Sequence, residues 1–294
     1  MKLLFGLTVF GLALGLVAAP AAAPQTKEEK IEAEAAKKAP KITPDKVVTY
    51  RSADGKDLVL NCFFPKNWKA SDTRPAIIFF HGGGWSAGAP EQFFIHARYF
   101  NDRGFVTICP SYRLGKTGED IYNGVADAKS AIRYIKSHAA DFGLNPDRMT
   151  FAGSSAGAHL SLSAMLSDEV NNPGDDLKIS TMPQGIILFC PVVNCGPDGY
   201  APAYRRLGDT YAKVSPAGLL RENMAPMIML LGTKDSILTE AKANAFADAV
   251  AARGGSCRVV MFPDLKHGAF YAEKNFLAAS EAINQFLAAN KLGD

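Results

Sequence analysis

Short apolar runs alternate with amphipathic segments from about residue 47 to the end of the chain. The runs are rich in Ile, Val, Leu and Phe, as buried strands are, and the segments between them carry apolar residues at helical spacing. This alternation predicts an α/β fold: a mostly parallel sheet with helices on both faces. The expected strands are AIIFF ending at Phe80, 105–109, 148–153, 185–193, 227–232 and 257–262, and the expected helices are 91–102, 124–140, 157–167, 239–253 and 272–290.

Two further strand-like runs precede this series. VVTYRS at 47–52 and LVLNCFF at 58–64 flank the dipeptide Asp54-Gly55. Asp-Gly between two such runs favours a tight hairpin turn, because both residues tolerate a positive φ. We therefore expect the folded catalytic domain to span residues 47–294.

The residues before this domain differ from it in composition and hydrophobic pattern. Lys2 precedes an apolar run at 3–17 and a small-residue stretch at 18–23. This is the pattern of a secretory signal peptide, and the run is shorter than the roughly 20 residues that a membrane span needs. We expect a signal peptide at 1–23, cut near its end, and a linker rich in Ala, Lys, Glu and Pro at 24–46. The mature protein should then be secreted or periplasmic, without stable membrane insertion.

Composition and cysteine spacing argue against some classes of partner and cofactor. The 294 residues are 48% hydrophobic and 21% charged with a formal net charge of +3, which is ordinary for a globular protein, and no Lys/Arg cluster in the expected domain indicates nucleic acid as a partner. No cysteine pair has zinc-site spacing, so we expect no metal. The cysteines allow at most two disulfides, with Cys190 and Cys195 close enough to pair and Cys109 expected as a buried hydrophobe; the other two are Cys62 and Cys257.

A serine near the middle of the chain lies in a G-x-S-x-G motif. The expected strand 148–153 runs directly into Gly153-Ser154-Ser155-Ala156-Gly157 and then into the expected helix 157–167. A strand, a sharp turn and a helix in this order form a nucleophile elbow, in which side chains at positions 153 and 157 would collide with neighbouring elements. We predict Ser155 as the nucleophile. An ordinary turn is the alternative, because the motif also occurs by chance.

Three successive glycines follow the expected strand AIIFF. In the segment His81-Gly82-Gly83-Gly84-Trp85 they leave backbone N–H groups free to point into a cleft, as an oxyanion site requires. A dinucleotide-binding loop would need the spacing G-x-G-x-x-G, which this segment lacks. We predict an oxyanion hole made by the N–H groups of Gly83, Gly84 and Ala156. A flexible glycine loop is the alternative.

A serine nucleophile needs a neutral imidazole to accept its proton, and five histidines are candidates. His267 follows the strand 257–262, so it should lie at the same edge of the sheet as Ser155. His81 opens the glycine loop and is expected to brace it. The other three fall in expected helices, where surface or packing roles are commoner: His96, His138 and His159. We predict His267 as the general base.

The imidazole in turn needs a carboxylate that accepts its second hydrogen bond. Asp235 follows the strand 227–232 and precedes His267, which keeps the chain order Ser, Asp, His of this architecture. Asp264 is the alternative, since it lies three residues before His267, although it could equally fix a turn. We predict Asp235 as the third member of the triad.

With these residues assembled, the chain from about residue 47 to its end resembles the bacterial hormone-sensitive-lipase-like branch of the α/β-hydrolase superfamily, including secreted carboxylesterases and acetyl xylan esterase-like proteins. Three further segments match landmarks of that family and are expected to be structural: Ser111-Tyr112-Arg113-Leu114, Asp127-Ala128 and Asn145-Pro146-Asp147-Arg148. The chain departs from the pattern at Ser154, where an acidic residue is usual, and at Ala158, where Gly is frequent. The resemblance also implies a minimal cap, because only the linker precedes the first strand.

Three functions compete on this fold: a carboxylesterase, a serine peptidase and a catalytically silent binding protein. Related peptidases usually carry an additional large domain, for which the chain has no room, and a silent protein would be expected to lack a triad residue. We therefore expect a serine carboxylic ester hydrolase that needs no cofactor. Its substrate should be a small-molecule or carbohydrate ester.

The segment from about 193 to 222 is the basis for a prediction of the acyl chain length of the substrate. We expect it to be a loop region with few large aliphatic residues before Leu219 and Leu220, and so poorly suited to enclose a long alkyl tail. Its polar and aromatic residues could contact a sugar ring, or could be solvated loop residues. Acetyl and similarly short esters are therefore expected, with O-acetyl groups on carbohydrate as the favoured substrate. The residues in question are Tyr200, Tyr204, Arg205 and Arg206.

Overall fold

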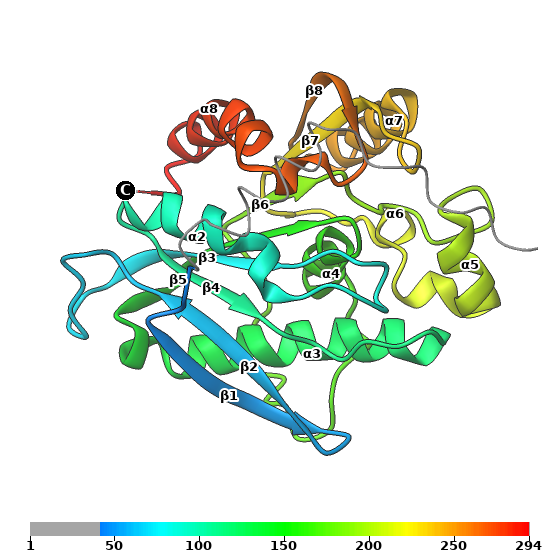
Figure 1. The fold of residues 1–294 in the computed structure, drawn as a ribbon. Coiled ribbons are helices and arrows are strands. Elements are labelled where there is room, and N and C mark those ends of the chain that lie inside the picture. The colour runs from blue at the N-terminus through cyan, green and yellow to red at the C-terminus, as the bar shows by residue number, and fades with distance from the viewer. Residues whose placement is uncertain (1–41, 294) are drawn as a thin grey trace, which may run out of the picture. The chain divides into compact units, whose positions relative to one another are not determined.

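An eight-stranded mixed sheet runs through the centre of the protein, whose computed structural model describes residues 42–293 (Figure 1). The strand order is β1-β2-β4-β3-β5-β6-β7-β8; β2 is antiparallel to both of its neighbours, and the strands from β4 to β8 are parallel to one another. The mostly parallel α/β sheet is thus confirmed. The strands are β1 (Lys46–Ala53), β2 (Lys56–Phe63), β3 (Arg74–Phe80), β4 (Val106–Pro110), β5 (Leu144–Ser154), β6 (Gly185–Phe189), β7 (Met227–Lys234) and β8 (Cys257–Lys266).

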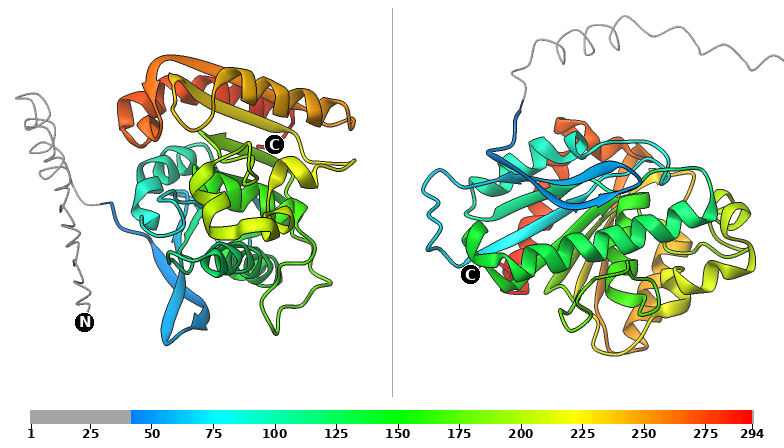
Figure 2. Two further views of the ribbon diagram at one scale, coloured as in Figure 1. Left: turned by 90° about the vertical axis from the view of Figure 1, so that its right-hand side faces the viewer. Right: turned by 90° about the horizontal axis from the view of Figure 1, so that it is seen from below.

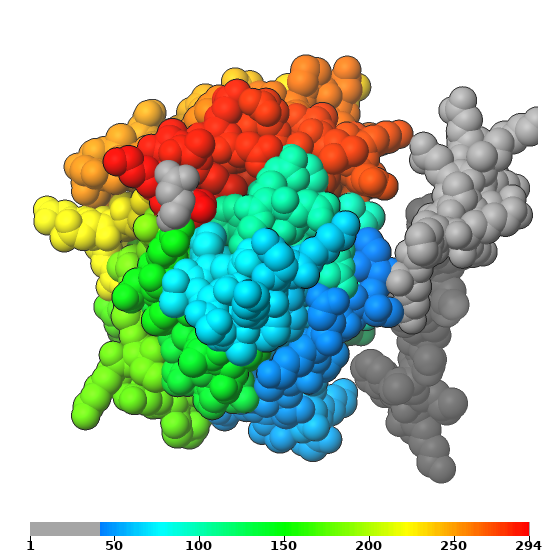
Figure 3. Space-filling model, turned by 90° about the vertical axis from the view of Figure 1, so that its left-hand side faces the viewer, coloured from blue at the N-terminus to red at the C-terminus, as the bar shows by residue number. Residues whose placement is uncertain are grey.

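Helices cover both faces of this sheet (Figures 1 and 2). The helices α2 and α8 lie on one face and α3 and α4 on the other, and α7 packs beside β8. On one side of the molecule α8, in red, lies directly above the blue-green α2 (Figure 3), where the rings of Tyr99 and Phe276 meet at 5.1 Å. The longer helices are α2 (Phe94–Asn101), α3 (Gly118–Ser137), α4 (Ala156–Leu166), α7 (Glu240–Ala251) and α8 (Glu273–Ala289).

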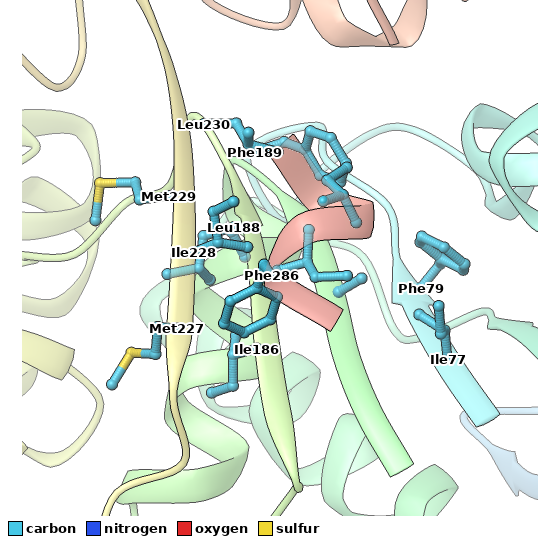
Figure 4. Packing of buried hydrophobic residues seen from close by; sticks show 14 of the residues in the cluster. Ile77, Phe79, Ile186, Leu188, Phe189, Met227, Ile228, Met229, Leu230 and Phe286 are labelled. Atoms are coloured by element: carbon cyan, nitrogen blue, oxygen red, sulfur yellow. The ribbon is translucent and has the colours of Figure 1, made fainter. Parts of the chain in front are cut away.

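Side-chain alternation along β3 divides the core into two layers. Ile77 and Phe79 belong to the cluster under α2 and α8, whereas Ile78 and Phe80 belong to the cluster under α3. This alternation is the period of two that any strand imposes. Figure 4 shows the first cluster from close by, with Phe286 of α8 packed against residues of β6 and β7. Strands buried on both faces explain why the sequence shows continuous apolar runs rather than polar alternation.

Several predicted boundaries were wrong, and one predicted loop contains helices. The helix expected at 124–140 begins at Gly118, because Thr117 and Asp120 form a capping box that apolar periodicity does not register. The segment expected as a loop between about 193 and 222 contains three short helices: α5 (Ala201–Leu207), η3 (Gly208–Lys213) and α6 (Pro216–Leu219). These helices are too short for the periodicity of a sequence window to reveal.

The N-terminal predictions fall largely outside the described residues. The signal peptide at 1–23 and the linker up to residue 41 are not described. The last residues of the predicted linker belong to the folded body, which begins at Ile42, since Arg98 pairs with Asp45 at 2.8 Å. Over residues 42–293, no helix has the length and apolar character needed to cross a bilayer.

The chain order places two loops together at one edge of the sheet. From β3 the chain passes outward to β4 and then returns by α3 to β5 on the other side of β3. The carboxyl ends of β3 and β5 therefore lie at a point where the strand order reverses, which is where ligands bind in sheets of this kind. The glycine loop follows β3 and the G-x-S-x-G turn follows β5.

A buried ion pair joins the segment after β4 to α3 and includes residues of two of the family landmarks. Arg113 donates two hydrogen bonds of 2.8 Å to the carboxylate of Asp127, whose side chain is fully buried. Asn172 donates a further bond of 2.8 Å to the same carboxylate. The pair keeps the strand edge and the helix in register, in agreement with the structural role expected for both residues.

Replacing Asp127 with Ala should lower the free energy of unfolding by roughly 3–5 kcal/mol, because the largely buried Arg113 guanidinium loses its buried counter-charge and keeps only the exposed carboxylate of Asp54 at 3.9 Å. Chemical denaturation at neutral pH measures the loss. The double variant Arg113→Met, Asp127→Leu removes both charges and should lose clearly less. A single variant no less stable than the double variant would contradict the buried-charge explanation.

Candidate active site

The turn after β5 has the geometry of a nucleophile elbow. Ser155 lies between β5 and α4 with φ 54° and ψ −115°, a conformation rarely adopted by a residue with a side chain. A Cβ at Gly157 would come within 1.9 Å of the Phe80 carbonyl oxygen, and one at Gly153 would come within 2.4 Å of Gly157. Both glycines of the motif are therefore required by backbone contact, as expected from the sequence.

A hydrogen-bonded chain joins Ser155 to His267 and Asp235. The Nε2 atom of His267 lies 2.9 Å from the Ser155 hydroxyl, and its Nδ1 atom lies 2.8 Å from Oδ2 of Asp235. A carboxylate can only accept, so Nδ1 carries the proton and Nε2 is free to accept one from the hydroxyl. The structure thus brings together the three residues singled out from the sequence, from the ends of β5, β7 and β8.

The Asp235 carboxylate is held by two backbone N–H groups as well as by the imidazole. Oδ1 accepts hydrogen bonds from Ile237 at 2.7 Å and from Leu238 at 3.0 Å. Burial works to raise the pKa of Asp235, but the hydrogen bonds from His267, Leu238 and Ile237 outweigh it and lower the pKa below its ordinary value. Asp235 is therefore ionised at neutral pH and oriented toward the imidazole.

The electrostatics of His267 follow from this carboxylate. Burial works to lower the pKa of the imidazole, but its hydrogen bonds to Asp235 and Cys190 and the negative charge of Asp235 raise the pKa above its ordinary value. The raised pKa means that the site stabilises an imidazolium, which is the state that follows proton transfer from the serine.

Asp264, the alternative third member, points elsewhere. Its carboxylate pairs with Lys234 at 2.6 Å, and its backbone N–H donates to the Thr233 hydroxyl at 2.9 Å. The residue is exposed and has a φ of 59°. It fixes the turn that leads to His267, which is the structural role considered for it.

The other four histidines are occupied away from the Ser155 hydroxyl. His81 stacks on Tyr112 at the start of the glycine loop, and Tyr112 donates to its carbonyl oxygen at 2.8 Å. The bracing expected for His81 is thus present. Burial lowers the pKa of His81 and of His159 to about 4, so both are neutral at working pH. His96 is buried within the aromatic cluster around Phe276, and His138 bonds to the Tyr134 carbonyl at the end of α3.

The glycine loop and the start of α4 offer unpaired N–H groups. Gly83 and Gly84 have φ of 122° and 61°, and within residues 42–293 their N–H groups have no protein acceptor. Ala156 is the first residue of α4, so its N–H has no intrahelical acceptor. Trp85 ends the loop with a φ of 60°, which costs a non-glycine residue about 1–3 kcal/mol and must be stabilised by its surroundings.

Cys190 lies beside the triad, a position that is not predicted from the sequence. Its sulfur accepts from the Gly268 N–H at 3.4 Å, and its ligand atom lies within 4.8 Å of those of Asp235 and His267. In the part of the chain that the structure describes, this is the one group of three side chains that could hold a metal ion. The position of Cys190 directly after an apolar strand could have indicated that it lies at the same sheet edge as the triad.

All five thiols are free, so the pairing of Cys190 with Cys195 is not formed.

An apolar cavity of about 310 Å³ lies next to the residues that contact the triad. Ile237 and Leu238, which hold Asp235, form part of its wall, and so does Val192, whose N–H is 3.5 Å from the Ser155 carbonyl oxygen. Ala217 of α6 and Phe246 of α7 contribute to the wall, together with Leu220 just after α6. The segment between β6 and β7 thus encloses apolar space, contrary to the expectation that it would be an open loop.

Comparisons with known proteins agree with this geometry. The BD-FAE family model matches residues 60–186. The native esterase 2 of Thermogutta terrifontis has a TM-score of 0.80 and 33% sequence identity, over 86% of this chain and 95% of that one. Carboxylesterase NlhH of Mycobacterium tuberculosis is 30% identical over 46% of this chain and 43% of its own length. Endo-1,4-beta-xylanase B of Butyrivibrio fibrisolvens is 24% identical over 70% of this chain and 34% of its own length.

The family assignment depends on how much of each known protein the match covers. Among the curated relatives, the matched stretch spans between 15% and 51% of the relative's length. The match to esterase 2 covers 95% of the solved chain, and 33% of the aligned residues are identical. On that ground the chain belongs to the α/β-hydrolase superfamily, in its hormone-sensitive-lipase-like branch of carboxylesterases.

Proposed function

We propose that the protein is a secreted serine carboxylesterase that hydrolyses short-acyl esters through an acyl-enzyme on Ser155. The observation that carries the proposal is the chain of two hydrogen bonds, 2.8 and 2.9 Å long, from Asp235 through His267 to Ser155. A hydroxyl becomes a nucleophile when a neutral imidazole held by a carboxylate can take its proton. The free N–H groups of Gly83, Gly84 and Ala156 form the oxyanion hole of this proposal.

In the first half of the reaction, the Ser155 oxygen attacks the ester carbonyl carbon while Nε2 of His267 takes the hydroxyl proton. The carbonyl oxygen becomes an oxyanion, which the three N–H groups stabilise. The imidazolium then gives its proton to the departing alcohol oxygen as the carbon–oxygen bond breaks. In the second half, water loses a proton to His267, attacks the acyl-enzyme and releases the carboxylic acid and free Ser155.

The size of the apolar cavity supports a short acyl group. Its volume of about 310 Å³ lies at the lower end of the range for small-molecule sites. Structures of Thermogutta esterase 2 with bound propionate and with bound butyrate show that a similar protein holds acids of this length. The open loop expected from the sequence is replaced by apolar space in the structure, so a small cavity becomes the physical reason for the proposed preference.

O-acetyl groups on carbohydrate are the favoured natural substrate of this proposal. The predicted signal peptide directs the protein to where polysaccharide is found, and one relative is a xylanase of Butyrivibrio fibrisolvens. Arg206, which was considered as a sugar contact, instead donates to main-chain carbonyl oxygens. Tyr200 lines the cavity and remains a candidate for contact with a sugar ring.

Replacing Ser155 with Ala should reduce p-nitrophenyl acetate hydrolysis by on the order of 10⁴ to 10⁶, because loss of the nucleophile removes the acyl-enzyme route. Ser154→Ala is the matched control, since the Ser154 hydroxyl is buried against the Cys190 sulfur. Steady-state kinetics on both variants decide the assignment. An inactive Ser154→Ala beside an active Ser155→Ala would move the nucleophile to position 154.

Replacing Asp235 with Asn should lower kcat by about 10⁴, whereas Asp264→Asn should change it little. The pH profile adds a second readout. The Asp235 carboxylate raises the pKa of His267, and activity needs the neutral imidazole, so activity rises with pH through that pKa. Removing the carboxylate should therefore move the acidic limb of the residual kcat/KM profile to lower pH. An unshifted limb, or an equal loss in Asp264→Asn, would count against Asp235.

The acyl preference can be measured on p-nitrophenyl acetate, butyrate, octanoate and palmitate, and on acetylated xylan. We expect kcat/KM to be highest for the two shortest acyl chains, because a small cavity excludes the longer ones, and we expect release of acetate from the xylan. A lipid interface should give no activation. Highest activity on palmitate would refute the short-acyl proposal, and absence of acetate release would refute the carbohydrate substrate alone.

A further inference from the structure

We propose that Arg206 and His159 are positioning residues that hold the oxyanion loop in its active shape and couple it to the segment between β6 and β7. The inference rests on the proposed role of the Gly83 and Gly84 N–H groups. Three successive glycines have more backbone freedom than any other tripeptide, so a loop of this composition needs anchors from outside. The two residues provide anchors at adjacent positions, Gly84 and Trp85.

Arg206 anchors the first position from α5. Its guanidinium donates to the Gly84 carbonyl oxygen at 2.8 Å and to the Gly115 carbonyl oxygen at 2.9 Å, and it also donates to Thr117. It lies 5.7 Å from the centre of the Trp85 ring. All four hydrogen bonds from this cation thus end on main-chain carbonyl oxygens. A planar fork of donors suits this task, which the single ammonium of lysine cannot reproduce.

His159 anchors the second position from α4. The indole N–H of Trp85 lies 3.2 Å from Nδ1 of His159, and Nε2 lies 2.8 Å from the Val214 carbonyl oxygen. An indole N–H can only donate and a carbonyl oxygen can only accept. Nδ1 must therefore be the acceptor and Nε2–H the donor, which fixes the tautomer. Because burial lowers the pKa of His159 to about 4, the neutral ring persists at working pH.

Both anchors lead to the segment that lines the apolar cavity. Arg206 belongs to it directly, and His159 reaches it through Val214. Trp85 is buried, has a positive φ, and also packs near Tyr200 of the cavity wall, with 6.3 Å between ring centres. The segment that lines the cavity is therefore bonded directly to the oxyanion loop through Arg206 and contacts the second anchor through Val214.

The Arg206 experiment compares Arg206→Met and Arg206→Lys with Arg205→Met, which removes the neighbouring exposed charge. On p-nitrophenyl acetate, Arg206→Met should lower kcat about tenfold or more with KM changed by less than threefold, because a misplaced oxyanion donor acts on the transition state. The inhibition constant of phenylboronic acid, which forms a tetrahedral adduct on serine, should rise in parallel. Lysine should restore the activity only in part, and Arg205→Met should behave as the wild type.

The His159 experiment uses two substitutions that each keep half of the imidazole. Asn places an amide oxygen where Nδ1 accepts from Trp85, whereas Gln places an amide nitrogen near Nε2, where it can donate to Val214. We expect His159→Asn to keep kcat within about threefold of the wild type and His159→Gln to lose about tenfold or more. Thermal unfolding of both variants is measured alongside, because a purely structural role predicts activity losses that follow stability.

The outcomes separate this inference from the proposed function. Absence of ester hydrolysis in the wild type, or its persistence in Ser155→Ala, would refute the proposed function. With that activity established, wild-type kcat and boronate affinity in both Arg206→Met and His159→Gln would overturn the positioning role. Equal losses in His159→Asn and His159→Gln that follow their loss of thermal stability would also overturn it for His159.

Discussion

The contact of the backbone at Gly157 with the carbonyl oxygens of Phe80 and His81 is the constraint on which the site depends. A Cβ at position 157 would lie 1.9 Å from one of these oxygens and 2.4 Å from the other. The start of α4 can therefore pack directly on the end of β3. This approach forces the tight turn at Ser155 and brings the N–H of Ala156 to the side of the glycine loop. The same backbone contact thus places the predicted nucleophile next to the glycine loop.

The charge distribution of the site depends on Asp235. Its carboxylate is buried but accepts hydrogen bonds from two backbone N–H groups and from His267, which keeps it ionised. An ionised carboxylate in a buried position stabilises the imidazolium more strongly than an exposed one could, because little solvent screens the interaction. The ion pair of Arg113 and Asp127 is likewise little screened by solvent, and it holds α3 against the sheet edge.

The segment between β6 and β7 contacts both the apolar cavity and the glycine loop. It forms part of an apolar cavity of about 310 Å³ beside the residues that hold Asp235. Arg206 of this segment bonds to Gly84, and Val214 bonds to His159, which in turn contacts Trp85. In the proposed function, this segment would therefore influence both the choice of acyl group and the shape of the oxyanion loop.

The sequence by itself determined the α/β class, the strand order in the chain and the nucleophile turn, because apolar runs, glycine spacing and G-x-S-x-G act locally. It also placed His267 and Asp235 at the correct sheet edge, since parallel strands end on the same side. Tertiary structure alone decided which aspartate faces His267, because a hydrogen bond depends on direction as well as on nearness along the chain. The start of α3 lies at a local capping box, which apolar periodicity does not register. Tertiary structure also decided the short helices after β6, the position of Cys190 and the anchoring by Arg206 and His159. These depend on contacts between residues up to 122 positions apart, which no local pattern encodes.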